Sequence, residues 1–289
     1  MDRNTILVTG GAGRLGRALG RLGCNAPGRN ALDIMDRASI AQAIRQSRPK
    51  LVINAAAYTN VDGAEADADR ARQINSTGAG RVAEVCAEET IPLIHISTDM
   101  VFSQGDPDRT ETEQATPAPN SVYGQSKLDG ELAVRAAGGR HCIARVSWLF
   151  SGEGESFITK ILAVAAQRDN LQLVDDEYGR PTHVDTLAAH LLKLSNLMVA
   201  NKTVPQLLHL GPPGPVSRYG WAREIFDVSG QCGGPTPEMT PVPGSTFPTP
   251  AERARGLVLD VALADGLLGP MPAWQPMSAS VVRNSIGKA

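Results

Sequence analysis

The sequence predicts an α/β fold in which a doubly wound parallel sheet is joined to a smaller, loop-rich domain. Three observations predict this. Short apolar runs alternate with helix-like segments, the first run leads into a glycine-rich turn, and Pro and Gly crowd the last third of the chain. The apolar runs are mostly continuous, which is typical of strands whose two faces are both covered by helices.

Strands are expected in six apolar runs, at residues 5–10, 51–57, 93–97, 142–150, 171–175 and 207–211. Helices are expected between them, at residues 37–48, 67–89, 126–138 and 218–230. In the first helix Ile40, Ala43 and Ile44 recur at helical spacing. The domain prediction assigns residues 1–145 to the sheet domain, with returning segments around 169–200 and 250–265, and residues 146–168 with about 201–289 to the substrate region. The Pro-rich stretch 234–250 is either a disordered linker or a loop over the substrate.

Composition excludes several classes of protein. Hydrophobic residues make up 42% of 289 and charged residues 20%, which is typical of a soluble globular chain, and the net charge of −2 gives no reason to expect a nucleic-acid partner. No apolar run approaches the roughly 20 residues of a membrane span, and the N-terminus lacks a signal-peptide core, so a cytoplasmic protein is expected. The four cysteines and five histidines show no metal-ligand spacing, so reduced thiols and no metal site are expected.

The stretch "TILVTGGAGRLG" is a strand leading into Gly10, Gly13 and Gly16 and then a helix. Glycines permit a tight turn and close approach of the backbone to a pyrophosphate, and the N-terminus of the helix offers N–H groups to it. The stretch therefore predicts a Rossmann-type dinucleotide site that includes Arg14 and Leu15 of the turn. A tight turn without a ligand is the alternative.

The second strand is expected near "GCNAPGRNALD", where an acidic residue would hold the ribose of NAD. The expected strand end reads Gly28–Arg29 instead. Arg29, helped by Arg14, is placed to pair with a 2′-phosphate, and Asp33 is included among the cofactor contacts. NADPH is therefore the predicted cofactor, with NADH left open. The alternative is that both arginines are solvated surface charges.

In "SVYGQSKLDGELA" a Tyr precedes a Lys by four residues. Residues at this spacing are neighbours on a helix, so Tyr123 and Lys127 are either an ordinary exposed pair or two groups that share a catalytic role.

Seven motifs in order, "TGGAGRLG", "NAAAYTNVDGAE", "STDMVF", "SVYGQSKLDGE", "RVSWLFSGEGESF", "EYGRPT" and "FPTPAER", resemble the extended short-chain dehydrogenase/reductases. The likeness is greatest to the dTDP-4-dehydrorhamnose reductase family and covers nearly the whole chain. It implies hydride transfer from a nicotinamide to the C4 ketone of a nucleotide-linked 4-keto-6-deoxy sugar. The catalytic triad of the family matches Thr98, Tyr123 and Lys127.

The resemblance implies a role for each triad member. Tyr123 protonates the alkoxide as hydride arrives, and Thr98 hydrogen-bonds the ketone oxygen. Lys127 holds the nicotinamide ribose, and its ammonium group is expected to lower the pKa of the phenol from about 10.

Further residues are implied around both ligands. Asn54, Ala55 and Ala56 match a stretch that lines the cofactor, although small residues after a buried strand need no cofactor. The implied substrate contacts are Val61 (in the loop 58–62), Asp99, Trp148 and Arg253. Core packing for Trp148 and simple solvation for Arg253 are the alternatives.

The chain departs from the family pattern at Met100, at Gly63 and after Arg253, where a Pro and a Ser are lost. These changes surround the sugar and put its identity in doubt, so a related keto-sugar reductase or an epimerase stays open. Met100 stands where a dehydratase carries its second acid, which argues against dehydration. A non-catalytic regulatory subunit resembling that of methionine adenosyltransferase also stays open, as does a homodimer.

Overall fold

A five-stranded, all-parallel sheet forms the centre of the computed structural model, which describes residues 2–287. Its order is β1 (Ile6–Thr9), β2 (Leu51–Asn54), β3 (Leu93–Thr98), β4 (His141–Val146) and β9 (Leu207–Leu210). Every residue of β1, β2 and β4 is buried, as their continuous apolar runs require. The predicted α/β fold class is confirmed.

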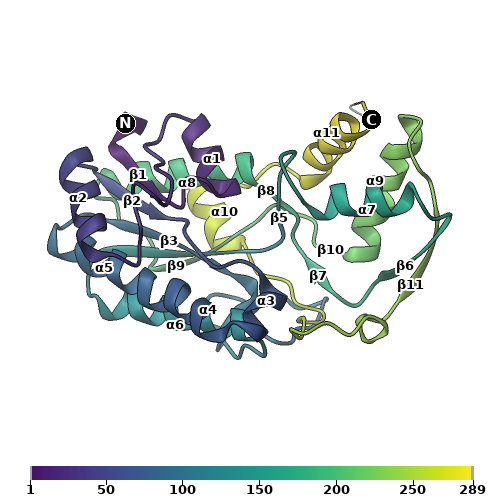
Figure 1. Ribbon diagram of the computed structural model, residues 1–289, viewed down its shortest axis with the longest axis horizontal. Helices are drawn as coiled ribbons and strands as arrows, with labels where there is room; N and C mark the ends of the chain where they lie inside the picture. The colour runs from purple at the N-terminus through teal and green to yellow at the C-terminus, as the bar shows by residue number, and fades with distance from the viewer. Residues whose placement is uncertain (1, 288–289) are drawn as a thin grey trace.

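Helices cover both faces of this sheet (Figure 1). One face carries α1 (Arg14–Arg21), α8 (Val184–Val199) and α10 (Ala262–Leu268), whose apolar side chains share a core with β1 and β4. The other face carries α2 (Arg37–Ser47), α5 (Ala79–Glu88) and α6 (Val122–Ala136). The sheet is therefore sealed from water except at the ends of its strands.

The expected second strand is nearly absent. Only Asn25 pairs with β1, through a single parallel bridge to Leu7 and hydrogen bonds with Ile6 and Val8. Pro27 follows two residues later, and Pro has no N–H for a ladder, so the pairing does not continue. Leu32 and Ile34 of the next stretch are buried against α2 instead.

The helix expected at residues 67–89 is broken into three parts. Residues Ala68–Arg72 form α4, Gln73–Gly78 a π-helical turn, and α5 follows. Inside the turn, buried Asn75 bonds both the N–H and the C=O of Tyr58, at 2.8 and 3.0 Å, and Ser126 Oγ at 2.9 Å. The turn thus ties the loop before α3 (Val61–Ala66) to α6.

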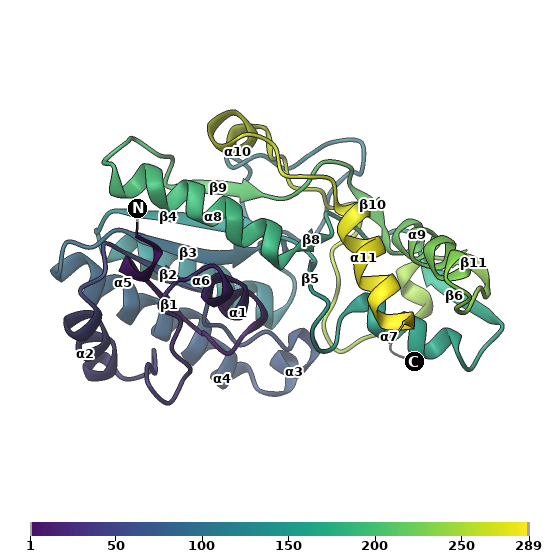
Figure 2. The same ribbon diagram turned by 90° about the horizontal axis from the view of Figure 1, so that it is seen from above.

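A second lobe packs beside the sheet lobe, and β5 and β8 lie between the two (Figure 2). It contains α7 (Phe157–Ala165), α9 (Arg218–Gln231) and α11 (Trp274–Ile286), which share an apolar core around Trp221. Its short strands pair as β5 (Leu149–Phe150) with β8 (Thr182–His183), β7 (Tyr178–Gly179) with β10 (Val216–Ser217), and β6 (Asn170–Val174) with β11 (Glu238–Val242).

Two runs therefore differ from the predicted division of the chain. The run at 171–175, assigned to the returning segments of the sheet domain, becomes β6 and pairs with β11 outside the central sheet. The run at 207–211, placed with the substrate region, supplies the edge strand β9 of that sheet. The Pro-rich stretch 234–250 holds β11 and the short 3-10 helix Gly244–Thr246, so it is an ordered strap.

Candidate active site

A cavity of about 800 Å³ opens where the strands of the central sheet reach their carboxyl ends. Parallel sheets build ligand sites at this edge. All of the predicted site residues except Asn54 line the cavity: Gly10, Gly13, Arg14, Leu15, Gly16, Arg29, Asp33, Ala55, Ala56, Val61, Thr98, Asp99, Tyr123, Lys127, Trp148 and Arg253. The sequence motifs are therefore brought together in space.

The glycine turn needs its glycines. Gly10 has a φ of +70°, and a Cβ there would lie 2.7 Å from Ala56 Cα; a Cβ on Gly16 would lie 2.3 Å from the oxygen of Gly10. Helix α1 starts after Gly13, and no side chain caps its first N–H groups. A close backbone approach and uncapped N–H groups at the mouth of a cavity fit a pyrophosphate.

Asn54 does not line the cavity. It is fully buried, its Oδ1 accepts a bond from Thr9 Oγ1 at 2.5 Å, and its Nδ2 lies 3.1 Å from His95 Nδ1. Thr9 Oγ1 in turn accepts the N–H of Ala56 at 3.3 Å. Asn54 therefore fixes the loop that carries Ala55 and Ala56.

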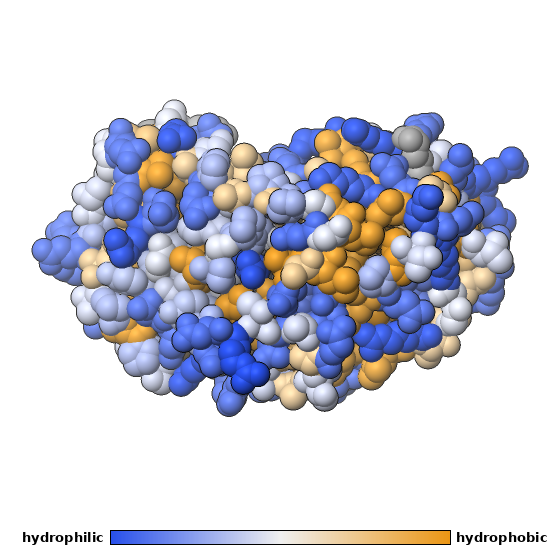
Figure 3. Space-filling model, turned by 180° about the vertical axis from the view of Figure 1, so that it is seen from behind, coloured by the Kyte–Doolittle hydropathy of each residue, from blue (hydrophilic) through white to orange (hydrophobic). Residues whose placement is uncertain are grey.

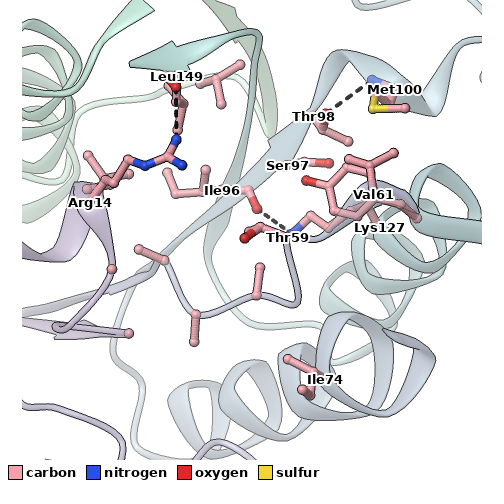
Figure 4. A pocket seen from close by; sticks show the side chains of 18 of the residues that line it. Arg14, Thr59, Val61, Ile74, Ile96, Ser97, Thr98, Met100, Lys127 and Leu149 are labelled. Carbon is pink, nitrogen blue, oxygen red and sulfur yellow. Dashed lines mark hydrogen bonds between the residues drawn. The ribbon is translucent and has the colours of Figure 1, made fainter. Parts of the chain in front are cut away.

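The two arginines proposed for a 2′-phosphate are in different surroundings. The guanidinium of Arg29 is 59% exposed and reaches Asp33 at 3.3 Å, an arrangement that a phosphate could replace. Arg14 donates to the carbonyl of Leu149 in the second lobe at 3.2 Å (Figure 4). Arg14 thus spans the cavity from α1 to β5.

Tyr123 lies in the first turn of α6, which begins at Val122. Ser121 caps the helix through the N–H of Gly124, and Glu65 accepts the N–H of Val122. Lys127 is only 2% exposed, and its Nζ donates to the carbonyl of Ile96 at 2.7 Å (Figure 4). An exposed surface pair is therefore excluded.

The expected lowering of the Tyr123 pKa is wrong for this structure. Burial disfavours the phenolate and the nearby Asp99 carboxylate repels it, so the pKa of Tyr123 is raised to about 12, although Thr98 acts in the opposite direction. Burial lowers the pKa of Lys127 to about 8, with Glu131 opposing this. At neutral pH Tyr123 is a neutral phenol, the form that donates a proton.

Thr98 and Asp99 stand where β3 ends. Thr98 Oγ1 donates to Asp99 Oδ1 at 3.0 Å and accepts the N–H of Met100 at 3.2 Å. Burial raises the pKa of Asp99 to about 6, against the opposing effects of the Thr98 hydrogen bond and Arg218. A buried carboxyl group beside the phenol is thus part of the site.

Trp148 lines the cavity and also packs in the second lobe. Its ring lies 5.9 Å from that of Trp221 in a stacked arrangement, and a Cβ on Gly179 would lie 2.4 Å from it. Its backbone φ of +46° is strained for a residue other than Gly.

Arg253 is not simply solvated. Its Nη2 pairs with Asp62 at 2.8 Å, and its Nη1 donates to the carbonyl of Ala251 at 2.9 Å. The sequence prediction missed Arg218 and Glu177, which also line the cavity. Glu177 stands in the "EYGRPT" motif, whereas Arg218 begins a helix and carries no signal that separates it from a surface arginine.

Within residues 2–287 no group of three or more His, Cys, Asp or Glu side chains could hold a metal ion, and no helix is long and apolar enough to cross a membrane. Cys24, Cys86, Cys142 and Cys232 are free thiols.

A parallel sheet with a glycine turn, joined in one cavity to a Tyr and a buried Lys one helical turn apart, is typical of the extended short-chain dehydrogenase/reductases. The family model described as the RmlD substrate binding domain matches residues 4–286, and the chain belongs to this family.

Individual relatives agree with this membership. The chain is 36% identical to a dTDP-4-dehydrorhamnose reductase of Mycobacterium tuberculosis (strain ATCC 25618 / H37Rv), over 96% of this chain and 92% of the relative. It is 33% identical to another of Sinorhizobium fredii, over 88% and 87% of the two chains. A crystal structure of dTDP-4-dehydrorhamnose reductase from Bacillus anthracis in complex with NADP is similar with a TM-score of 0.84 and 28% identity, covering 98% of this chain and 99% of that one.

Proposed function

We propose that the chain catalyses the NADPH-dependent reduction of dTDP-4-dehydrorhamnose to dTDP-rhamnose. The observation that carries the proposal is the position of Tyr123 and of the buried Lys127 in the same cavity as Thr98 and the glycine turn. The relatives that share the family are named for this reaction, and one is crystallised with NADP.

The residues present fit a dinucleotide. The pyrophosphate would lie on the N–H groups at the start of α1, and Arg29 would exchange Asp33 for the 2′-phosphate. Three of the four residues Asn54–Ala57 border the cavity directly, and Asn54 holds them from behind. When bound, NADPH supplies the hydride.

Proton delivery follows from the charges of the site. Tyr123 is neutral at pH 7 and would give its proton to the oxygen that gains charge at C4, while the hydroxyl of Thr98 would turn from Asp99 to donate its one hydrogen bond to that oxygen. Lys127 uses one N–H on Ile96, so two others are left for the nicotinamide ribose and for the phenolate that forms. Its ammonium group would act on the phenolate once proton transfer begins, rather than lowering the pKa beforehand.

The sugar nucleotide would occupy the part of the cavity between the lobes, bordered by Val61, Asp99, Trp148 and Arg253. Met100 and Leu257 give this part apolar surface, and both lie in segments that depart from the family pattern. This arrangement suits a 6-deoxy sugar, whose C6 methyl has no hydroxyl to satisfy.

The test is turnover. Purified protein would receive NADPH or NADH with dTDP-4-dehydrorhamnose, and the loss of cofactor absorbance would be followed. We expect turnover with NADPH and a loss of at least ~100-fold in kcat for Tyr123→Phe, the range of a positioned acid. Unaltered NADPH binding by the variant serves as the folding control. A wild-type protein that binds NADPH but turns over no keto-sugar nucleotide would refute the proposal and favour a regulatory role.

Cytoplasmic location and a homodimer are part of the same proposal. The back of the molecule shows apolar surface gathered over the sheet lobe (Figure 3), and Leu263 of α10 is 43% exposed. Light scattering of the purified protein would measure its mass against the 30.5 kDa of one chain.

A further inference from the structure

The guanidinium of Arg218 is a cation with open donors inside the cavity. It makes no hydrogen bond to any of residues 2–287, and its nearest acidic oxygen, Glu177 Oε2, lies 3.8 Å from Nε. The side chain is 27% exposed, and the exposed part faces the cavity that it lines. A half-buried guanidinium with five unused donors is ready to take a ligand oxyanion.

The guanidinium is held in place without hydrogen bonds. Arg218 is the first residue of α9, its N–H donates to the carbonyl of Glu177 at 3.1 Å, and Ser217 caps the helix through Gly220 at 3.0 Å. The guanidinium carbon lies 3.5 Å above the Trp148 ring and 5.2 Å from that of Phe157. Stacking fixes the plane of the guanidinium group and leaves its N–H groups free to bind a ligand.

The other cation of this region differs in this respect. Arg253 already donates to Asp62 and to the carbonyl of Ala251, so part of its charge and two of its five N–H groups are in use. Burial raises the pKa of the Glu177 carboxyl, and the positive charges of Arg218 and Arg253 oppose this effect in part. Two arginines on one side of the cavity match the two charges of a diphosphate, and of the two Arg218 is the one whose five side-chain donors are all open.

We propose that Arg218 binds a phosphate group of the nucleotide diphosphate of the substrate and so selects sugar nucleotides over free sugars. The inference rests on the proposed function and adds a specificity residue to it. The planar fork matches phosphate oxygens in two-point fashion, whereas a sugar hydroxyl would use one donor and leave the charge unpaired. The phosphate takes the place of the distant Glu177 as partner of the guanidinium.

The experiment is calorimetric titration of dTDP and of thymidine into the protein saturated with NADP⁺. Arg218→Met keeps length and apolar packing on Trp148 but removes the fork, and it should weaken dTDP binding about 10- to 100-fold while thymidine binding stays unchanged. Arg218→Lys should fall between the two. Arg168→Met, an exposed arginine outside this cavity, is the matched control and should bind dTDP like the wild type.

Wild-type dTDP affinity in Arg218→Met, or an equal loss for dTDP and thymidine, would overturn the inference. A variant with normal dTDP binding but lowered kcat would also overturn it, because that result would place Arg218 beside the sugar and not beside the phosphates. Unchanged NADPH affinity shows that Arg218→Met is folded. If Arg218→Met does not fold, the same titrations are made with Arg218→Lys. An Arg218-dependent affinity for dTDP in a protein without turnover would refute the proposed reaction and leave this assignment standing.

Discussion

A buried ion pair joins Glu131 of α6 to Arg145 of β4, and its removal tests how the helix that carries Tyr123 and Lys127 is held in place. Glu131 lies one turn after Lys127 on α6 and is fully buried; its carboxylate accepts Arg145 Nε at 2.8 Å, Arg145 Nη2 at 2.7 Å and Ser97 Oγ at 2.6 Å. Arg145→Met would leave this carboxylate with one close hydrogen bond. Breaking such a pair from one side costs about 3–5 kcal/mol. The guanidinium of Arg135 lies 3.6 Å from the carboxylate and can compensate in part, so we expect about 3 kcal/mol.

The assay is urea unfolding of Arg145→Met, Glu131→Met and the double variant. Removing both charges leaves an apolar contact of similar volume, so the double variant should cost about 1 kcal/mol, well below the sum of the two single changes. NADPH binding reports whether α6 keeps its position in each variant. A cost below about 1 kcal/mol for Arg145→Met, or additive costs in the double variant, would refute the reasoning that the pair anchors α6 electrostatically.

Two further predictions concern the sugar side of the cavity. The pKa of Asp99 is raised from 3.8 to about 6 by burial, so the folded protein holds this proton more tightly and loses stability as pH rises from about 4 to 6. Asp99→Asn should therefore gain up to about 3 kcal/mol over the wild type above pH 6 and nothing near pH 4, by urea unfolding at both pH values; an equal gain at both would contradict the assigned cause. Gly179→Ala would place a methyl group 2.4 Å from the ring of Trp148, so KM for the sugar nucleotide should rise while NADPH affinity stays normal; unchanged steady-state kinetics would show that Trp148 does not position the sugar.

Much of the sheet lobe could be predicted because its signals are local. Continuous apolar runs specify strands covered on both faces, and the glycine turn specifies a strand, a close backbone contact and a helix in succession. The chain from Gln73 to Gly78 could not be predicted as a π-helical turn, because its side-chain pattern continues that of α5. Its cause is distant: Asn75 bonds Tyr58 and Ser126, and a Cβ on Gly130 would lie 2.1 Å from the oxygen of Asn75.

The residues of the candidate site also divide into those that the sequence predicts and those that it does not. Thr98, Tyr123 and Lys127 follow from motifs at strand and helix ends, and the structure brings them into one cavity. The pKa of Tyr123 could not be predicted from the Tyr–Lys spacing, because burial and the Asp99 carboxylate, which the spacing does not reveal, raise it. Arg218 was missed because its importance comes from Trp148, which is remote in sequence.

The crossing point between the lobes has a consequence for how such proteins diversify. The chain leaves β4 at Val146 and reaches Trp148, with its left-handed backbone, two residues later. Residues for hydride chemistry thus belong to the sheet lobe, and Trp148, Glu177 and Arg218 belong to the second lobe, which the chain enters at this left-handed corner. Side chains of the second lobe can therefore change to suit another sugar while Asp99, which raises the pKa of Tyr123, keeps its place in the sheet lobe.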